Sequence, residues 1–310
     1  MPLGRHHVNR MGREMSNALH TILGVSDGGA GLPELLLPPV GQPILTLAAI
    51  GLCVLAVWVL RRLIRPDKLK LTICPSRSNC LNPAHLFLVF ATAIVANYLA
   101  RVVGQSLLDC SSTEVAVLSS VCQSAFSLVA GLAVASLAFR NGASRGMGFN
   151  SRRWLNDSIR AVIAYLAVLP LCEILRLAAG WTIVVLLSQP ERFVQQHVLL
   201  KALSTVAAPW QVLAIVSAVI LAPLAEEVFF RGLVQSMLRR YCGNAWIAIL
   251  ITSALFALVH WQQLHAIPAL FVLSVALGYN YERTGRLHAP ILIHVFFNAM
   301  YVIEHIAKAQ

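Results

Sequence analysis

Long runs of apolar residues recur along the chain, and they restrict its fold more than any other feature. The run at 44–60, ILTLAAIGLCVLAVWVL, is typical. A helix needs ~20 apolar residues to cross the hydrocarbon core of a bilayer, and several runs approach or exceed that length. They are continuous stretches of Leu, Ala, Val and Ile without the strict alternation of a membrane-spanning strand. The sequence therefore predicts an all-α, multi-pass transmembrane helical bundle.

The composition agrees with an integral membrane protein, and we expect the plasma membrane. Hydrophobic residues make up 58% of the chain and charged residues 12%, whereas charged residues are about 25% of a soluble globular domain. We expect about eight spans, at residues 44–60, 84–103, 115–139, 155–187, 207–238, 244–260, 266–282 and 289–305. The fourth contains Pro170, Glu173 and Arg176. We therefore expect it either to kink or to split into a span and an interfacial piece.

Three regions follow from this arrangement. Residues 1–40 contain no span and read as a flexible N-terminal tail. Residues 41–200 read as N-terminal transmembrane helices, and residues 201–310 as the helical core that carries the polar motifs described below.

Basic residues fall in alternate loops. They are Arg61, Arg62, Arg65, Lys68, Lys70 and Arg77, then Arg140, Arg145, Arg152 and Arg153, then Arg239 and Arg240, then Arg283 and Arg286. Cytoplasmic loops of membrane proteins are enriched in Lys and Arg, so we expect these loops to face the cytoplasm. This arrangement and the anionic lipid headgroups account for the formal net charge of +11. No basic face with interleaved aromatics is present, so we expect no nucleic-acid partner.

The stretch EEVFFR, residues 226–231, places three ionisable groups inside the fifth predicted span. An ionisable group at the centre of a span costs roughly 2.5–3.5 kcal/mol, so its presence is by default a hypothesis of function. Glu227 and Arg231 are four residues apart with the acid first, which favours an ion pair on a helix. Glu226 points about 100° away from Glu227 and stays free to face a neighbouring helix.

Two further polar motifs lie downstream, FALVH ending at His260 and HVFFN containing His294 and Asn298. Counting about 1.5 Å per residue along the helices puts Glu226, His260 and Asn298 at compatible depths, with His294 somewhat shallower. An acid, two histidines and an amide donor that meet in the membrane form a site able to handle water and a carbonyl group. Each residue alone also fits a structural role, such as a buried ion pair or a hydrogen bond between helices.

These three motifs, in this order, resemble the EExxxR, FxxxH and HxxxN motifs of the CPBP family. That family contains the CAAX-processing prenyl-protein endopeptidases and the bacterial Abi proteins linked to bacteriocin processing and immunity. The resemblance covers roughly residues 200–305 and makes 201–310 the expected catalytic core. It implies an intramembrane endopeptidase without a cofactor, acting on a membrane-associated peptide, a prenylated protein or a leader peptide.

The resemblance also implies a role for each motif residue. Glu226 and His260 would activate a water molecule, and His294 and Asn298 would bind the oxyanion. Glu227 and Arg231 would support them.

Two other functions fit the same residues. A metalloprotease would use Glu226, His260 and His294 as zinc ligands and leave the fourth position open for water, although the chain has no HExxH motif. A non-catalytic membrane protein would use the buried acids and histidines as a proton relay in transport, or would bind a peptide without cutting it, as an immunity protein does.

Overall fold

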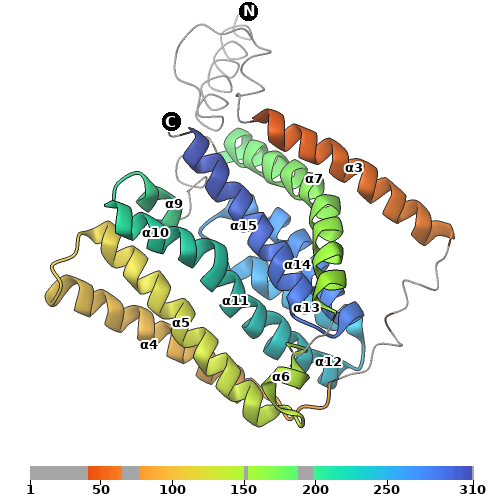
Figure 1. The fold of residues 1–310 in the computed structure, drawn as a ribbon, viewed down its shortest axis with the longest axis horizontal. Coiled ribbons are helices and arrows are strands. Elements are labelled where there is room, and N and C mark those ends of the chain that lie inside the picture. The colour runs from red at the N-terminus through yellow and green to blue at the C-terminus, as the bar shows by residue number, and fades with distance from the viewer. Residues whose placement is uncertain (1–40, 65–70, 72–76, 150–152, 188–197, 309–310) are drawn as a thin grey trace, which may run out of the picture.

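A computed structural model describes residues 41–64, 71, 77–149, 153–187 and 198–308 (Figure 1). The predicted tail, residues 1–40, lies outside this part of the chain. Among the described residues the secondary structure is helical, and the one β-type pairing is an isolated bridge between Asn79 and Phe139. The predicted all-α fold is confirmed.

Helical segments match all eight predicted spans. They are α3 (Gly41–Ile64), α4 (Pro83–Ser106), α5 (Ser112–Ala138), α7 (Trp154–Leu187), a composite helix over Ala208–Cys242, α13 (Ala245–Val259), α14 (Ile267–Thr284) and α15 (His288–Lys308). Three short helices lie between them: α6 (Gly142–Gly146), α9 (Val198–Leu203) and η4 (Leu264–Ala266). Six of the described helices are long and apolar enough to cross a membrane, and Thr46–Arg61 and Ala245–Val259 are shorter apolar helices. The chain is therefore a multi-pass membrane protein.

Helices α4 and α5 form a pair along one side of the composite helix (Figure 1). Both begin with a capping box. Asn82 accepts a hydrogen bond from the backbone of His85, and Ser111 accepts one from the backbone of Glu114. In each case the side chain three residues on bonds back to the cap, so two N–H groups are satisfied at each helix start.

The fourth span is a single helix that continues through Pro170, so the predicted alternative of a split span is wrong. Proline removes one N–H group from the helix. Helix α3 packs against this part of α7 through Gly51, where an added Cβ would lie 2.1 Å from the carbonyl oxygen of Leu166. A glycine is therefore required for the two backbones to approach so closely.

The composite helix contains two π-helical segments. Its parts are α10 (Ala208–Val216), η2 (Ser217–Leu221), α11 (Ala222–Glu227), η3 (Val228–Gln235) and α12 (Ser236–Cys242), of which η2 and η3 are π-helical. Pro223 lies just after η2 and has no N–H to donate. The N–H of Ala222 bonds to Ser217, five residues back. The carbonyl of Ala218 therefore receives neither an α-helical hydrogen bond, which Ala222 would donate, nor a π-helical one, which residue 223 would donate.

The basic loops meet at one end of the bundle. The N–H of Leu287 bonds to the carbonyl of Met147, and Arg286 forms an ion pair of 2.5 Å with Asp157 at the start of α7. Arg77 bonds to the carbonyl of Tyr281 in α14. The loops that the charge pattern assigns to one side are thus side by side. That this side is the cytoplasm stays a prediction.

Candidate active site

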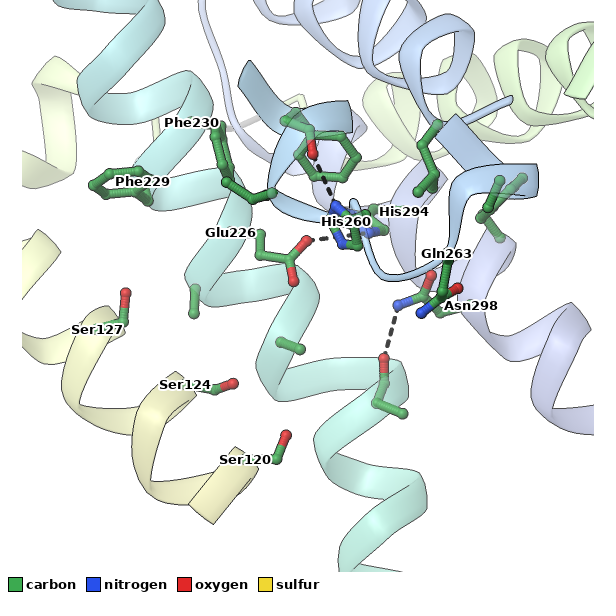
Figure 2. A pocket seen from close by; sticks show the side chains of 18 of the residues that line it. Ser120, Ser124, Ser127, Glu226, Phe229, Phe230, His260, Gln263, His294 and Asn298 are labelled. Atoms are coloured by element: carbon green, nitrogen blue, oxygen red, sulfur yellow. Dashed lines mark hydrogen bonds and ion pairs between the residues drawn. The ribbon is translucent and has the colours of Figure 1, made fainter. Parts of the chain in front are cut away.

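A cavity of about 970 Å³ lies between the composite helix, α5, α13, α14 and α15. Its wall contains all four predicted catalytic residues, Glu226, His260, His294 and Asn298 (Figure 2). Phe229 and Phe230 also line it. The three motifs, each at least 25 residues from the next in sequence, therefore face one space within the bundle.

Glu227 and Arg231 form the predicted ion pair. Arg231 Nη1 lies 2.9 Å from Glu227 Oε1, and both side chains are fully buried. Arg231 also donates to the hydroxyl of Ser274 at 2.7 Å and to its carbonyl at 3.3 Å. Its guanidinium group stands 4.8 Å from the centre of the Phe256 ring. A buried charge pair needs such additional partners, because its desolvation is not offset by the pair alone.

Glu226 differs from Glu227 in both exposure and contacts. Its side chain is 30% exposed, and its carboxylate faces the cavity. The Glu226 Oε2 atom lies 3.7 Å from Nε2 of His294, while Nδ1 of His294 lies 2.9 Å from Oε1 of Glu227. A carboxylate accepts hydrogen bonds, so Nδ1 of His294 carries the proton. His294 thus stands between the two acids, and Figure 2 shows it beside Glu226.

His260 follows the last residue of α13, where the chain leaves the helix. Its Nδ1 atom lies 2.8 Å from the carbonyl oxygen of Phe256. A carbonyl accepts a hydrogen bond, so Nδ1 is the protonated nitrogen, and in the neutral ring Nε2 carries the lone pair. The Phe256 ring packs 4.9 Å from the His260 ring and 5.7 Å from the His294 ring, centre to centre. This buried phenylalanine thus contacts both histidines.

Asn298 is held by the break in helical bonding described above. Its Nδ2 atom donates to the carbonyl of Ala218 at 2.8 Å. That carbonyl is available because Pro223 has no N–H and Ala222 bonds elsewhere. An amide NH₂ group has two N–H donors, so a second one remains for a ligand in the cavity.

A polar stripe on α5, which belongs to none of the three sequence motifs, lines the same cavity. Its members are Ser120, Gln123, Ser124 and Ser127, and Figure 2 shows the three serines on α5 across from Glu226. Their spacing of three, four and seven residues puts them on one helix face. This spacing of polar residues within the third predicted span was the sequence pattern from which the stripe could have been predicted.

The zinc alternative requires three ligands that converge. In the part of the chain that the structure describes, no three His, Cys, Asp or Glu side chains form a group able to hold a metal ion. The described residues therefore do not fit a three-ligand zinc site.

Comparison with known families and proteins agrees with the motif resemblance. Residues 208–300 match the family model described as "Type II CAAX prenyl endopeptidase Rce1-like". The match begins at the composite helix and ends within α15, so it contains every predicted catalytic residue. No solved structure matches.

Three curated bacterial proteins are similar to part of the chain. A protein of Escherichia coli named "Uncharacterized 24.3 kDa protein" is 38% identical over 90 residues, which are 28% of this chain and 42% of that protein. The protein named "Putative membrane peptidase YdiL" of Bacillus subtilis is 33% identical over 102 residues, 32% of this chain and 39% of that protein. The "UPF0177 protein YbdI" of Lactococcus lactis is 28% identical over 88 residues, 28% of this chain and 46% of that protein. The chain thus spans less than half the length of each.

Proposed function

We propose, from the premise that residues 208–300 form a domain of the Rce1-like family of type II CAAX prenyl endopeptidases, that the chain is an intramembrane endopeptidase. It hydrolyses a peptide bond with water activated by Glu226 and His260. One observation carries this proposal. Two acids are adjacent in the same apolar helix. Glu227 is neutralised by Arg231, whereas Glu226 is partly exposed in a cavity beside two histidines.

Hydrolysis of an amide needs a base, because water is a poor nucleophile. In the proposed mechanism the Glu226 carboxylate takes a proton from a water molecule, and the oxygen of that water attacks the carbonyl carbon of the peptide. Nε2 of His260 carries a lone pair and accepts the second hydrogen bond from the same water. Glu226 then delivers its proton to the leaving nitrogen, and the peptide bond breaks.

The negative charge that develops on the peptide oxygen needs donors. The second N–H of Asn298 is one, and Nε2–H of His294 in its imidazolium form is the other. In that form the ring of His294 is positively charged and lies between the negatively charged carboxylates of Glu226 and Glu227. Such donors act on the transition state, and removing one costs ~2.7–4 kcal/mol in other enzymes.

The cavity also fits a peptide substrate within the membrane. It is lined by apolar side chains such as Phe229, Phe230 and Leu270, which suit a lipid-modified or apolar segment. The serine hydroxyls of the α5 stripe stand opposite Glu226 and offer hydrogen bonds to an extended peptide backbone. The substrate class we propose is therefore a membrane-associated peptide, a prenylated protein or a leader-type sequence.

The test is cleavage by the purified full-length protein in nanodiscs. We would incubate the wild type and Glu226→Gln with a prenylated peptide ending in a CaaX sequence and with an apolar leader-type peptide, and detect products by mass spectrometry. We expect cleavage by the wild type and at least a ~100-fold lower rate for Glu226→Gln, the scale of general-base catalysis. Equal rates for the two proteins would refute the proposal.

The natural substrate is found by comparing cells. Membrane proteomes of cells that express the wild type or Glu226→Gln should differ in peptides with new termini inside or next to a span. A proton flux through reconstituted wild-type protein, with no cleavage of any peptide, would favour the transport alternative.

A further inference from the structure

We propose that a second cavity, at the end of the bundle where the basic loops meet, is a binding site for a phosphate-bearing anion, either a phospholipid headgroup or free phosphate. The cavity has a volume of about 360 Å³. It is lined by Arg77, Ser78, Asn79, Arg239, Arg240 and Gly243, none of which lines the catalytic cavity. Arg77 comes from the loop before α4, whereas Arg239 and Arg240 come from the last turn of α12, about 160 residues further along the chain.

Each of the three arginines is held in place by a neutral group. Arg77 donates to the carbonyl of Tyr281 at 3.0 Å, and its guanidinium carbon lies 3.7 Å from the centre of the Tyr281 ring. Arg240 donates to the carbonyl of Leu81 at 3.0 Å, and Arg239 donates to the carbonyl of Gly243. These contacts fix the orientation of the guanidinium groups but do not neutralise their positive charge. A guanidinium has five N–H donors, so donors remain at each residue.

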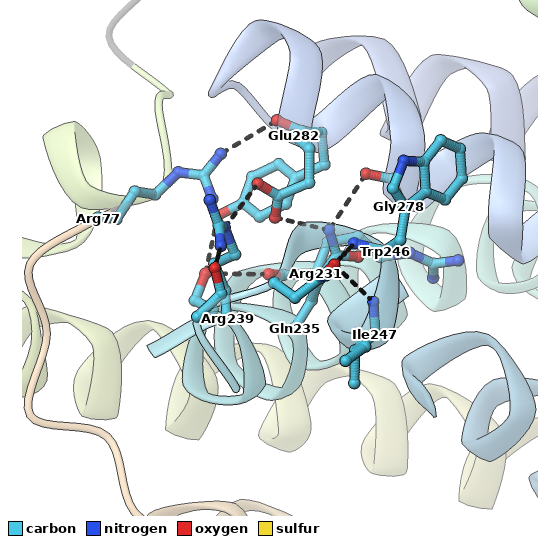
Figure 3. Close-up of polar contacts among 12 residues, drawn as sticks. Arg77, Arg231, Gln235, Arg239, Trp246, Ile247, Gly278 and Glu282 are labelled. Atoms are coloured by element: carbon cyan, nitrogen blue, oxygen red, sulfur yellow. Dashed lines mark hydrogen bonds and ion pairs between the residues drawn. The ribbon is translucent and has the colours of Figure 1, made fainter. Parts of the chain in front are cut away.

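The cationic charge around the cavity exceeds the anionic charge. Glu282 is the one carboxylate that the described residues place in an ion pair with any of the three arginines, 3.7 Å from Nε of Arg239 (Figure 3). Its other oxygen accepts a hydrogen bond of 2.9 Å from Gln235. Three arginines and one carboxylate leave two positive charges.

Arg239 is the residue for which this excess matters most. Its side chain is 10% exposed, and its Nε atom is buried without a hydrogen bond. An anion in the cavity would neutralise the excess positive charge around this side chain.

The chemistry of the cavity favours phosphate. Guanidinium groups bind phosphate oxygens through pairs of parallel hydrogen bonds, and the exposed Ser78 hydroxyl adds a neutral donor. The cavity also lies at the membrane end that the loop charges predict to be cytoplasmic, next to a leaflet rich in acidic lipids. Basic pockets between transmembrane helices on this side bind acidic headgroups in other membrane proteins.

The test measures binding of three probes to the full-length protein in neutral detergent. They are phosphatidylglycerol, phosphatidylcholine and inorganic phosphate, with lipid binding followed by native mass spectrometry and phosphate by competition and calorimetry. The variants are the double variant Arg77→Gln/Arg240→Gln and the charge-retaining Arg240→Lys. Arg145→Gln is the matched control, because it removes an exposed arginine from the same end of the bundle but outside the cavity.

We expect saturable binding of phosphatidylglycerol that is about 30-fold weaker in the double variant, the combined effect of two arginines near an acidic membrane surface. Arg145→Gln should bind like the wild type. Arg240→Lys keeps the charge but cannot form the paired hydrogen bonds, so it should bind more weakly than the wild type and more tightly than Arg240→Gln. Displacement of the lipid by millimolar phosphate would identify free phosphate as a ligand of the site, and resistance to it would identify the lipid headgroup. If the double variant fails to fold, the single Arg240→Gln, at an exposed residue, should lose about fivefold.

Three results would overturn the proposal. They are no saturable binding of phosphatidylglycerol or phosphate, wild-type affinity in a folded double variant, or an equal loss in Arg145→Gln. The last would show a general attraction of acidic lipids to the basic end of the bundle.

Discussion

Glu226 and Glu227 are adjacent in sequence but have different surroundings. This difference predicts different effects of replacing each acid by glutamine. Glu227 is fully buried and contacts both Arg231 and His294, whereas Glu226 is partly exposed in the cavity. We expect Glu226→Gln to abolish cleavage without lowering thermal stability. Glu227→Gln should destabilise the fold by about 3–5 kcal/mol, because Arg231 then stays buried without its counter-charge.

Denaturation midpoints and cleavage rates of both variants, normalised to folded protein, test this prediction. Arg231→Met serves as the reciprocal variant and should be destabilised like Glu227→Gln, because it strands the buried carboxylate. A fully stable Glu227→Gln that is as inactive as Glu226→Gln would assign Glu227 a direct part in the reaction.

The contacts of Asn298 predict that its replacement affects kcat more than KM. One N–H of its amide is used on Ala218, and the other is free to meet the oxyanion. Such a donor contributes as charge develops, so Asn298→Ala should lower kcat by about 100-fold or more with a small change in KM. Asn298→Asp, which keeps the size and removes the donors, should be equally slow. A rise in KM alone would place Asn298 in substrate binding.

At the scale of elements, the eight helical segments were predictable because each is a long apolar run whose limits are marked by charges, Pro or caps. The Glu227–Arg231 pair was predictable because both residues lie on one helix four residues apart. Contacts between helices were not. No pattern in the sequence indicates that Asn298 meets Ala218, or that the α5 stripe stands opposite Glu226, because both depend on how distant helices pack.

The π-helical turn before Glu226 was also not predictable, but its cause is visible in Pro223. The missing N–H of this residue leaves the Ala218 carbonyl free to anchor Asn298. Pro223→Ala restores an N–H that competes for the carbonyls of this turn. We expect a regular α-helix, an unanchored Asn298 and reduced kcat, while the thermal stability stays equal or rises. Kinetics, with helix content from circular dichroism, test this, and an unchanged kcat would separate the π turn from catalysis.

The polar stripe of α5 gives a second prediction at this scale. Ser124→Leu puts a large apolar side chain into the cavity and removes a hydroxyl that faces Glu226. We expect a raised KM with the fold intact. Ser136→Leu is the matched control, because Ser136 lies on the same helix, is exposed and does not line the cavity. Equal kinetics of the two variants would show that substrate does not contact α5.

The whole molecule separates two charged regions along the bundle. The predicted catalytic residues Glu226, His260, His294 and Asn298 line a cavity in the interior, and the arginine-lined cavity lies among the basic loops. Arginines at one end resist movement of the helices into the hydrocarbon and hold the bundle at a fixed depth. Under the proposed function, a fixed depth would determine which segment of a membrane-bound peptide reaches Glu226.

Metal content distinguishes the two hydrolytic mechanisms at the scale of the whole protein. A catalytic zinc works by lowering the pKa of a bound water to about 7, and its ligands must converge on the ion. The described residues contain no group of three side chains that does so. His294 instead faces a carboxylate with each ring nitrogen. We therefore expect purified protein to carry well under one equivalent of zinc and to keep its activity after prolonged chelation.

Elemental analysis must accompany the activity assay, because a chelator reaches a site inside a membrane protein slowly. The decisive comparison is between the wild type and His260→Ala, which removes the side chain that a zinc site would need and that water activation would also need. Zinc present at one equivalent in the wild type, and lost together with activity in His260→Ala, would contradict the metal-free mechanism. Low zinc in both proteins, with activity lost only in the variant, is the result that direct activation of water by Glu226 and His260 requires.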